Sequence, residues 1–175
     1  CIRDRYEVAY ERKGWAPGDF TKMGYTENPA GTQVDFKRML SELPKDKPFF
    51  LYYATWLVHT PVHTRSERLL DKYCKKLGVE RPGNPEEWTG EGQTNPFYCA
   101  MVEELDYYAG KMFDYLETTD DPRWPGHKLI ENTYIIFTSD NGGMERVPGQ
   151  IITDNYPLAR GKISAMEGGT RVPLI

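Results

Sequence analysis

Two oxygen-bearing side chains, Asp140 and Asn141, follow a short apolar run and precede two glycines. A carboxylate beside a carboxamide offers hard oxygen ligands, which suit Ca²⁺ or Mg²⁺ better than a thiophilic metal. The pair Gly142–Gly143 lets the backbone turn sharply and approach a ligand closely. The same residue types also dominate Asx-type turns that bind nothing. The pattern therefore indicates either a cation site or a plain turn.

The apolar run Tyr134–Phe137 predicts a buried strand that delivers these two residues. It is too short for a buried helix, and Thr133 and Thr138 on either side favour an extended backbone. Ligands of open α/β sheets bind outside the carboxyl ends of strands, which is where Asp140 is expected. We therefore expect a central strand of a covered sheet.

Two further stretches place polar groups in a similar way. The apolar run Phe49–Trp56 leads into His59, and the charged, glycine-rich stretch Arg160–Pro173 contains Lys162. An imidazole and an ammonium group together form an anion-binding set. Each residue also has an interpretation without function, since His59 could donate to a backbone carbonyl at a strand end and Lys162 could be a solvated lysine.

Taken together, these motifs resemble the sulfatase family of the alkaline-phosphatase-like superfamily. The resemblance spans roughly residues 33 to 175 and rests on the order and spacing of three motifs: His59-Thr-Pro61, Thr138-Ser-Asp-Asn-Gly-Gly143, and Lys162 with Glu167-Gly-Gly-Thr-Arg-Val-Pro173. It implies an α/β fold with a covered, mainly parallel or mixed β-sheet flanked by helices. It also implies hydrolysis of sulfate esters by a formylglycine, made from a Cys or Ser, beside one Ca²⁺.

The resemblance also implies a role for each candidate residue. Asp140 and Asn141 correspond to an Asp-Asn pair of calcium ligands, and His59 and Lys162 correspond to residues that touch the sulfate and its bridging oxygen. Hydrolysis of a sulfate monoester moves charge onto the leaving oxygen, so fixed cations and a proton donor are needed where that charge develops. His59 and Lys162 are therefore the expected catalytic residues.

Other parts of the family's site are missing from this sequence. It has no early Asp-Asp pair and no Cys-x-Pro-x-Arg motif. Cys1 stands four residues before Arg5, but charged residues replace the small ones of the motif, and the spacing to His59 is too short. We therefore expect one partial catalytic domain over 1–175, with formylglycine and further calcium ligands supplied by the remainder of a longer chain.

Apolar spacing predicts the helices that support these sites. Helices are expected from Thr32 to Pro44, from Ser66 to Leu77 and, most clearly, from Pro96 to Thr118. The carboxylates on the outer face of the last helix are expected to be solvated. Residues 1–32 are poorly defined by pattern, and 78–96 predict a surface loop because Pro and Gly recur there.

Composition excludes several classes of function. A formal charge of -4 over 175 residues gives no basic stripe for nucleic acid. No apolar run approaches the ~18 residues that a membrane helix needs. The three cysteines allow at most one disulfide within the chain. Family resemblance alone implies a periplasmic, secreted or lysosomal location.

Two other functions stay open on the sequence. The same scaffold serves phosphonate monoester hydrolases and phosphodiesterases. A noncatalytic module that binds sulfated glycans is the alternative from another class. The expected partner is a sulfate ester, with a sulfated glycan as one candidate.

The first prediction concerns geometry. Since strands of a parallel sheet end at one edge, Asp140, Asn141, His59 and Lys162 are expected to converge in a single cleft. An experimental structure of the complete protein that places His59 and Asp140 on opposite faces would contradict this.

Overall fold

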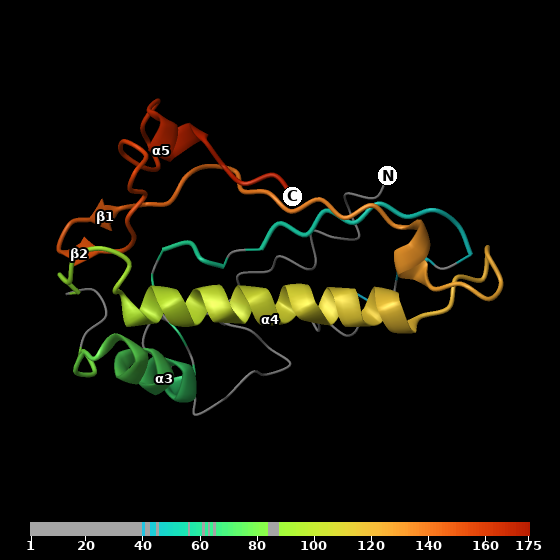
Figure 1. Ribbon diagram of the computed structural model, residues 1–175, viewed down its shortest axis with the longest axis horizontal. Helices are drawn as coiled ribbons and strands as arrows, with labels where there is room; N and C mark the ends of the chain where they lie inside the picture. The colour runs from blue at the N-terminus through green and yellow to red at the C-terminus, as the bar shows by residue number, and fades with distance from the viewer. Residues whose placement is uncertain are drawn as a thin grey trace.

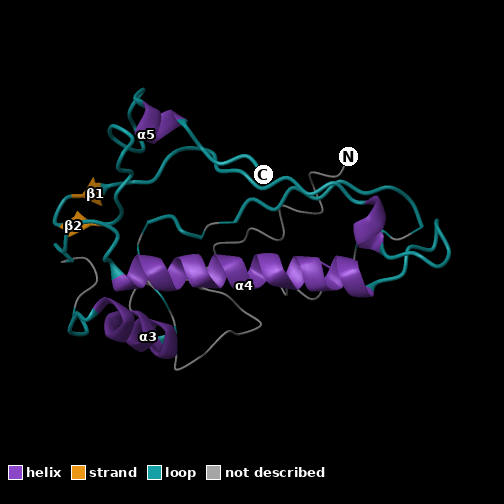
Figure 2. Cartoon of the chain, viewed as in Figure 1, coloured by secondary structure: helices purple, strands orange, loops and turns teal. Residues whose placement is uncertain are grey.

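The computed structural model describes residues 40, 43–44, 46–55, 57–60, 62, 64, 66–83 and 88–175. In chain order its elements are α3 (Glu67–Leu77), α4 (Pro96–Thr118), the short 3₁₀ helix η3 (Leu129–Asn132), β1 (Arg146–Val147), β2 (Gln150–Ile151) and α5 (Glu167–Thr170). The long helix α4 spans the molecule, and extended segments pass above it (Figure 1). Most of the remaining described chain is loop (Figure 2).

Helix α4 has the bounds that its apolar spacing predicts. Asn95 caps it, since its side-chain oxygen accepts hydrogen bonds from Phe97 N at 3.0 Å and Tyr98 N at 3.1 Å. Pro96 fills the first helical position, where a missing N–H costs nothing. The Asn95 amide also donates to Ile151 O at 2.9 Å. The cap therefore ties the start of α4 to β2 (Gln150–Ile151).

Helix α3 confirms the predicted helix near Ser66–Leu77. The Ser66 hydroxyl accepts a hydrogen bond from Leu69 N at 3.2 Å. Gly78, with φ of 69°, ends the helix in the left-handed region. The predicted helix from Thr32 to Pro44 lies almost wholly outside the described residues, although Leu40 and Leu43 are buried.

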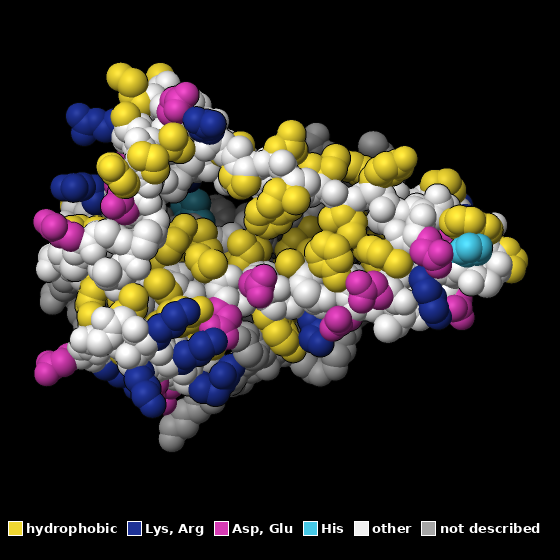
Figure 3. All heavy atoms as spheres, in the orientation of Figure 1, with side chains coloured by type: hydrophobic (Ala, Val, Ile, Leu, Met, Phe, Trp, Pro, Cys, Tyr) yellow, Lys and Arg dark blue, Asp and Glu magenta, His cyan; other side chains and the backbone are white. Residues whose placement is uncertain are grey.

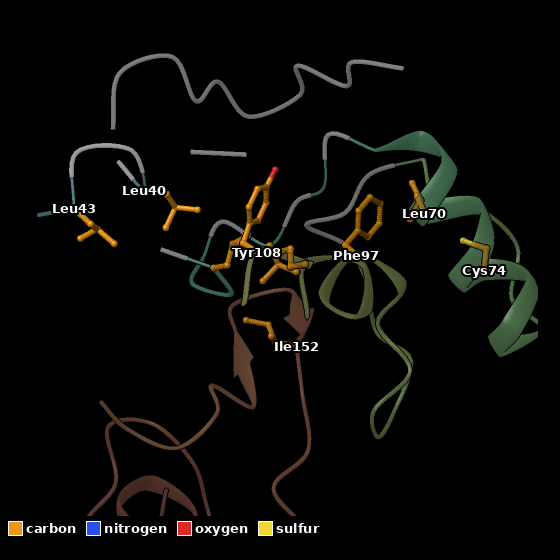
Figure 4. Packing of buried hydrophobic residues seen from close by; sticks show 10 residues of the cluster. Leu40, Leu43, Leu70, Cys74, Phe97, Tyr108 and Ile152 are labelled. Carbon is orange, nitrogen blue, oxygen red and sulfur yellow. The ribbon is translucent and has the colours of Figure 1, made fainter. Parts of the chain in front are cut away.

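The core forms where α3 packs on α4. Leu70 and Cys74 of α3 point toward Phe97 of α4, and Ile152 follows β2 into the same cluster (Figure 4). Tyr108 extends this cluster along α4. Burial raises the pKa of the Tyr108 hydroxyl, which keeps it neutral and compatible with the apolar surroundings. This cluster fixes the helices beneath the extended segments.

The first extended segment, 49–55, alternates between two environments. Phe49, Leu51 and Tyr53 pack against the core, whereas Phe50 and Tyr52 are exposed. This period of two is that of a pleated strand with one face covered. The sequence prediction of an extended segment before His59 is supported, but no ladder pairs it within the described residues.

The second extended segment corrects an expectation of burial. Tyr134 is 100% exposed and Ile136 is 72% exposed, so the predicted burial of Tyr134–Phe137 is wrong for this structure. Among the described residues the segment pairs only at its end, where Phe137 and Ile175 exchange backbone hydrogen bonds of 2.9 and 3.0 Å. Within the described residues, nothing covers its outer face. Hydrophobic side chains gather along this side of the molecule (Figure 3).

The sheet assigned within the described residues is a small hairpin rather than a parallel sheet. Arg146 pairs with Ile151, and Val147 pairs with Gln150, in antiparallel register. Pro148 and Gly149 form the two-residue connection, and Gly149 adopts a φ of 81° that favours glycine after proline in a turn. The two longer extended segments run in the same direction, opposite to α4, in the view of Figure 1.

One carboxylate of α4 is buried, although the sequence predicts that it is solvated. Glu104 is buried and accepts a hydrogen bond from the Thr64 hydroxyl at 3.2 Å. Its position on the side of α4 that faces Thr64, rather than the solvent side, explains the difference. Glu103 instead forms an ion pair with Lys72 of α3.

Two further findings concern the class of chain. No helix among the described residues has both the length and the apolar character needed to cross a membrane. Cys74 and Cys99 are free thiols, while Cys1 lies outside the described residues.

Two phenylalanines on α4 allow a matched test of this core. Phe97 is 0% exposed and Phe113 is 43% exposed. We expect Phe97→Ala to lower the free energy of unfolding by about 3–5 kcal/mol, because it leaves a cavity in the core. The same change at Phe113 should cost under about 1.5 kcal/mol, since little contact is lost. Denaturant unfolding measures both, and equal losses would contradict the described packing.

Candidate functional site

The candidate site is built where three loops meet through their backbones. Gly142 N donates to Gly169 O at 3.0 Å, and Lys162 N donates to Gly143 O at 2.9 Å. A third hydrogen bond of 2.9 Å runs from Gly168 N to Ala159 O. These bonds join the 140–143 turn, the 159–164 loop and the start of α5. We call this contact the glycine junction.

The glycines are required there because the backbones approach too closely for a side chain. A Cβ at Gly142 would lie 1.7 Å from Gly168 O, and one at Gly168 would lie 1.6 Å from Arg160 O. At Gly161 the nearest atom would be Gly143 O, at 2.3 Å. Real Cβ atoms do not approach other heavy atoms so closely. The glycine spacing therefore sets how close the three loops lie.

The loop that carries Lys162 has an uncommon backbone on both sides of it. Arg160 has a φ of 64°, and Ile163 has a φ of 72°. For a β-branched residue the left-handed region is costly, by about 1–3 kcal/mol. Such a conformation persists only when its surroundings hold it, and the Lys162–Gly143 hydrogen bond is one of the contacts that do so.

The predicted metal ligands lie in an exposed turn. The Ser139 hydroxyl donates to Asn141 O at 2.8 Å, which tightens the turn. The Asn141 amide nitrogen donates to Gly142 O at 2.9 Å, so its side-chain oxygen is left for another partner. Within the described residues the Asp140 carboxylate forms no ion pair. Both side chains can therefore present oxygen to a ligand.

Lys162 is bonded to this turn through its backbone, whereas His59 lies on the separate 57–60 segment. The backbone bond from Lys162 to Gly143 brings Lys162 to the turn of Asp140 and Asn141, and its ammonium forms no ion pair within the part of the chain described. His59 is exposed on the 57–60 segment, where its Nδ1 lies 2.8 Å from Thr60 O. The structure thus joins three of the four predicted residues through one junction. Convergence of His59 with them stays a prediction.

Sequence reasoning missed one residue of this site. Asn155 donates from its side-chain amide to Gly143 O at 2.9 Å. Nothing in the sequence marks it, because an asparagine in a polar loop has many ordinary roles. The sequence shows that glycines recur in these loops, but it does not show which of them contact one another.

The donor set fits calcium in kind but not in number. Asp140 and Asn141 offer hard oxygens from a turn whose backbone is locked by Gly142. Within the described residues no group of three or more His, Cys, Asp or Glu side chains could hold a metal. Ca²⁺ takes about six to eight oxygens. These residues therefore suit part of a calcium site.

Comparison with known proteins identifies one matching family. Residues 19–175 match the sequence profile of the Sulfatase family. The chain belongs to the sulfatase family. Membership implies an alkaline-phosphatase-like α/β fold for the domain of which this sulfatase chain is part.

Several curated sulfatases are similar to this chain. A protein named sulfatase from Formosa agariphila is 37% identical over 133 residues, covering 74% of this sulfatase chain and 21% of the relative. N-acetylgalactosamine-6-O-sulfatase from Bacteroides thetaiotaomicron is 28% identical over 174 residues, covering 94% of the chain and 28% of the relative. N-acetylgalactosamine-6-sulfatase from Canis lupus familiaris is 31% identical over 149 residues, covering 82% and 23%.

This chain covers a small part of each relative. The sulfatase chain spans between a fifth and three tenths of their length, from 21% to 28%. No solved structure is significantly similar to it.

Two glycines allow a matched test of the junction. Gly168→Ala should break the junction, because the new Cβ would overlap Arg160 O. We expect hydrogen–deuterium exchange of residues 140–171 to rise by a factor of about 10 or more, since their closing contacts are lost. Gly110 of α4 has open space around it, so Gly110→Ala should instead stabilise the chain by about 0.5–1 kcal/mol. Unchanged exchange in Gly168→Ala would contradict the described packing.

The incomplete donor set predicts weak metal binding. Asp140 and Asn141 supply a minority of the oxygens that Ca²⁺ prefers, so the 175-residue chain by itself should bind Ca²⁺ poorly. Isothermal titration calorimetry measures this directly. A tight, stoichiometric site in this chain would show that the assigned ligand set is wrong.

Proposed function

We propose that the protein containing this chain is a sulfatase that hydrolyses sulfate monoesters. Within it, Asp140 and Asn141 supply part of a calcium site, and His59 and Lys162 act on the sulfate. The observation that carries the proposal is the glycine junction, since it holds the backbone of Lys162 against the turn that contains Asp140 and Asn141. Family membership supports the reaction type.

Lys162 is suited to stabilise negative charge. Its backbone is anchored at Gly143, so the start of its side chain has a defined position beside the turn. A preorganised cation near a developing oxyanion lowers the barrier because no solvent must reorganise around it. We propose that the Lys162 ammonium contacts the sulfate and stabilises charge on the oxygen that leaves.

His59 is suited to proton transfer. An imidazole carries two ring nitrogens, one of which can donate a proton while the other accepts one. It is exposed, and its Nδ1 lies 2.8 Å from Thr60 O, a contact that orients the ring. We propose that His59 protonates the leaving group.

Two components come from outside these residues in the proposal. When bound, Ca²⁺ supplies a divalent charge that orients the nucleophile and binds sulfate oxygens. Asp140 and Asn141 would hold it from one side, through a carboxylate and an amide oxygen. The nucleophile, a formylglycine by family resemblance, belongs to another segment of the longer chain.

The finer architecture is part of the same proposal. We propose that the extended segments 49–55 and 133–138 are strands of a covered, mainly parallel sheet in the complete domain. The alternating burial of the first segment supports this, as does the shared direction of the two segments in Figure 1. In that arrangement the exposed Tyr134 and Ile136 would pack against parts of the protein beyond this chain.

A substrate class follows from the relatives. Two of them are named for a 6-sulfate of N-acetylgalactosamine, so we propose a sulfated amino sugar, within a sulfated glycan, as the first substrate to test. We propose a periplasmic, secreted or lysosomal location on family membership alone.

Removal of the Lys162 ammonium is the direct test. In the full-length protein, Lys162→Ala should lower turnover of an aryl sulfate by a factor of roughly 10² to 10³, which is typical for loss of one preorganised charge contact. Lys75→Ala on α3 is the matched control, because Lys75 is exposed and forms no ion pair within the described residues. Thermal unfolding checks that both variants fold.

Two outcomes would count against this assignment. Turnover close to that of the parent in a folded Lys162→Ala variant would remove Lys162 from the site. Hydrolysis of a bis-aryl phosphate in preference to the aryl sulfate would instead favour the phosphodiesterase alternative. Binding of sulfated glycan by the 175-residue chain without metal would favour the noncatalytic alternative.

A further inference from the structure

The backbone carbonyl oxygen of Gly143 connects two other parts of the candidate site. It accepts a hydrogen bond from Lys162 N at 2.9 Å and another from the Asn155 side-chain amide at 2.9 Å. A carbonyl oxygen has two lone pairs, so these two donors use its full capacity. One atom of the metal-ligand turn thereby holds both the Lys162 loop and the Asn155 side chain.

The Asn155 side chain also lies between the two backbones that must stay together. A Cβ built on Gly161 would meet Asn155 Nδ2 at 2.5 Å, and one built on Gly143 would meet Asn155 Oδ1 at 2.9 Å. The amide therefore fills the space that these two glycines leave open. It contacts the turn after Asn141 on one side and the start of the Lys162 loop on the other.

Asn155 is itself held from outside the junction. Its backbone carbonyl oxygen accepts a hydrogen bond from Leu158 N at 2.9 Å. Thr153, two residues earlier in the chain, donates its hydroxyl to Gln93 Oε1 at 2.7 Å, and the backbone of Ile152 donates to Glu145 O at 2.8 Å. The asparagine thus lies in the loop that follows β2, and the start of this loop is held by the buried Ile152 and by these hydrogen bonds.

We infer that Asn155 is a positioning residue, which sets the distance between the Lys162 ammonium and the Asp140–Asn141 ligand pair. This rests on the proposed function, because it gives Asn155 its effect through Lys162. Loss of the amide leaves Gly143 with one donor and opens a space beside Gly161, so the Lys162 loop can shift relative to the turn. A displacement of about 1 Å can cost a factor of 10² in rate.

A double-mutant cycle in the full-length protein tests the inference. Asn155→Ala should lower kcat for an aryl sulfate by a factor of about 10 or more, with a small change in KM. In a Lys162→Ala background the same change should have little further effect, because Asn155 acts through a side chain already removed. A residue that serves stability alone would lower activity by the same factor in both backgrounds.

Two variants guard against misfolding and nonspecific effects. Asn155→Asp keeps the shape of the side chain but removes the donor, so it should reproduce the loss of kcat with an unfolding temperature close to that of the parent. Asn132→Ala is the matched control, since Asn132 is the last residue of η3 and donates to Asp121 Oδ2 at 3.5 Å, outside the junction. It should leave kcat unchanged.

The outcomes separate this inference from the proposed function. Parental turnover in Lys162→Ala would overturn the proposed site and the role of Asn155 with it. Loss of turnover in Lys162→Ala with parental kcat in both Asn155 variants would overturn only the positioning role. Equal losses from Asn155→Ala in the two Lys162 backgrounds would do the same.

Discussion

Close packing of backbone against backbone is the constraint on which the candidate site depends. Gly142, Gly161 and Gly168 each lie where a Cβ would overlap a carbonyl oxygen of a neighbouring loop. Hydrogen bonds between main chains have fixed lengths and little rotational freedom, so they define loop positions more tightly than long side chains do. The backbones of Asn141 and Lys162 are therefore held in defined positions, because both residues lie next to glycines of the junction.

The helices supply the rigid base beneath these loops. The apolar cluster of α3 and α4 includes Ile152, which directly follows β2, and the Asn95 cap reaches the carbonyl of Ile151. The hairpin is thus attached to α4 by an apolar contact and by a polar one. Because Asn155 follows a few residues later, the position of the site derives ultimately from the burial of Phe97 and its neighbours.

Local patterns in the sequence predicted the helices well. The bounds of α4 follow from its apolar spacing together with Asn95 and Pro96, which are local signals. Burial of Tyr134–Phe137 was predicted from composition, and the structure contradicts it because burial depends on neighbours that a local pattern does not contain. Glu104 shows the same limit, since only its partner Thr64 reveals which side of α4 it faces.

The candidate site, too, could be predicted from the sequence only in part. Asp140, Asn141 and Lys162 were predicted from residue type and motif spacing, and the family match supports the motifs. The Gly143 carbonyl and Asn155 were not predictable, because their role lies in contacts between loops rather than in side-chain chemistry.

The exposed apolar segment has a consequence for how this polypeptide behaves in solution. Residues 134–136 are extended, and within the described residues they form no backbone ladder. An extended apolar stretch with unpaired main-chain groups is a template for pairing with another copy of itself. Expressed by itself, the chain should therefore self-associate through Tyr134 and Ile136 as its concentration rises, and charged substitutions at these two positions should keep it dispersed.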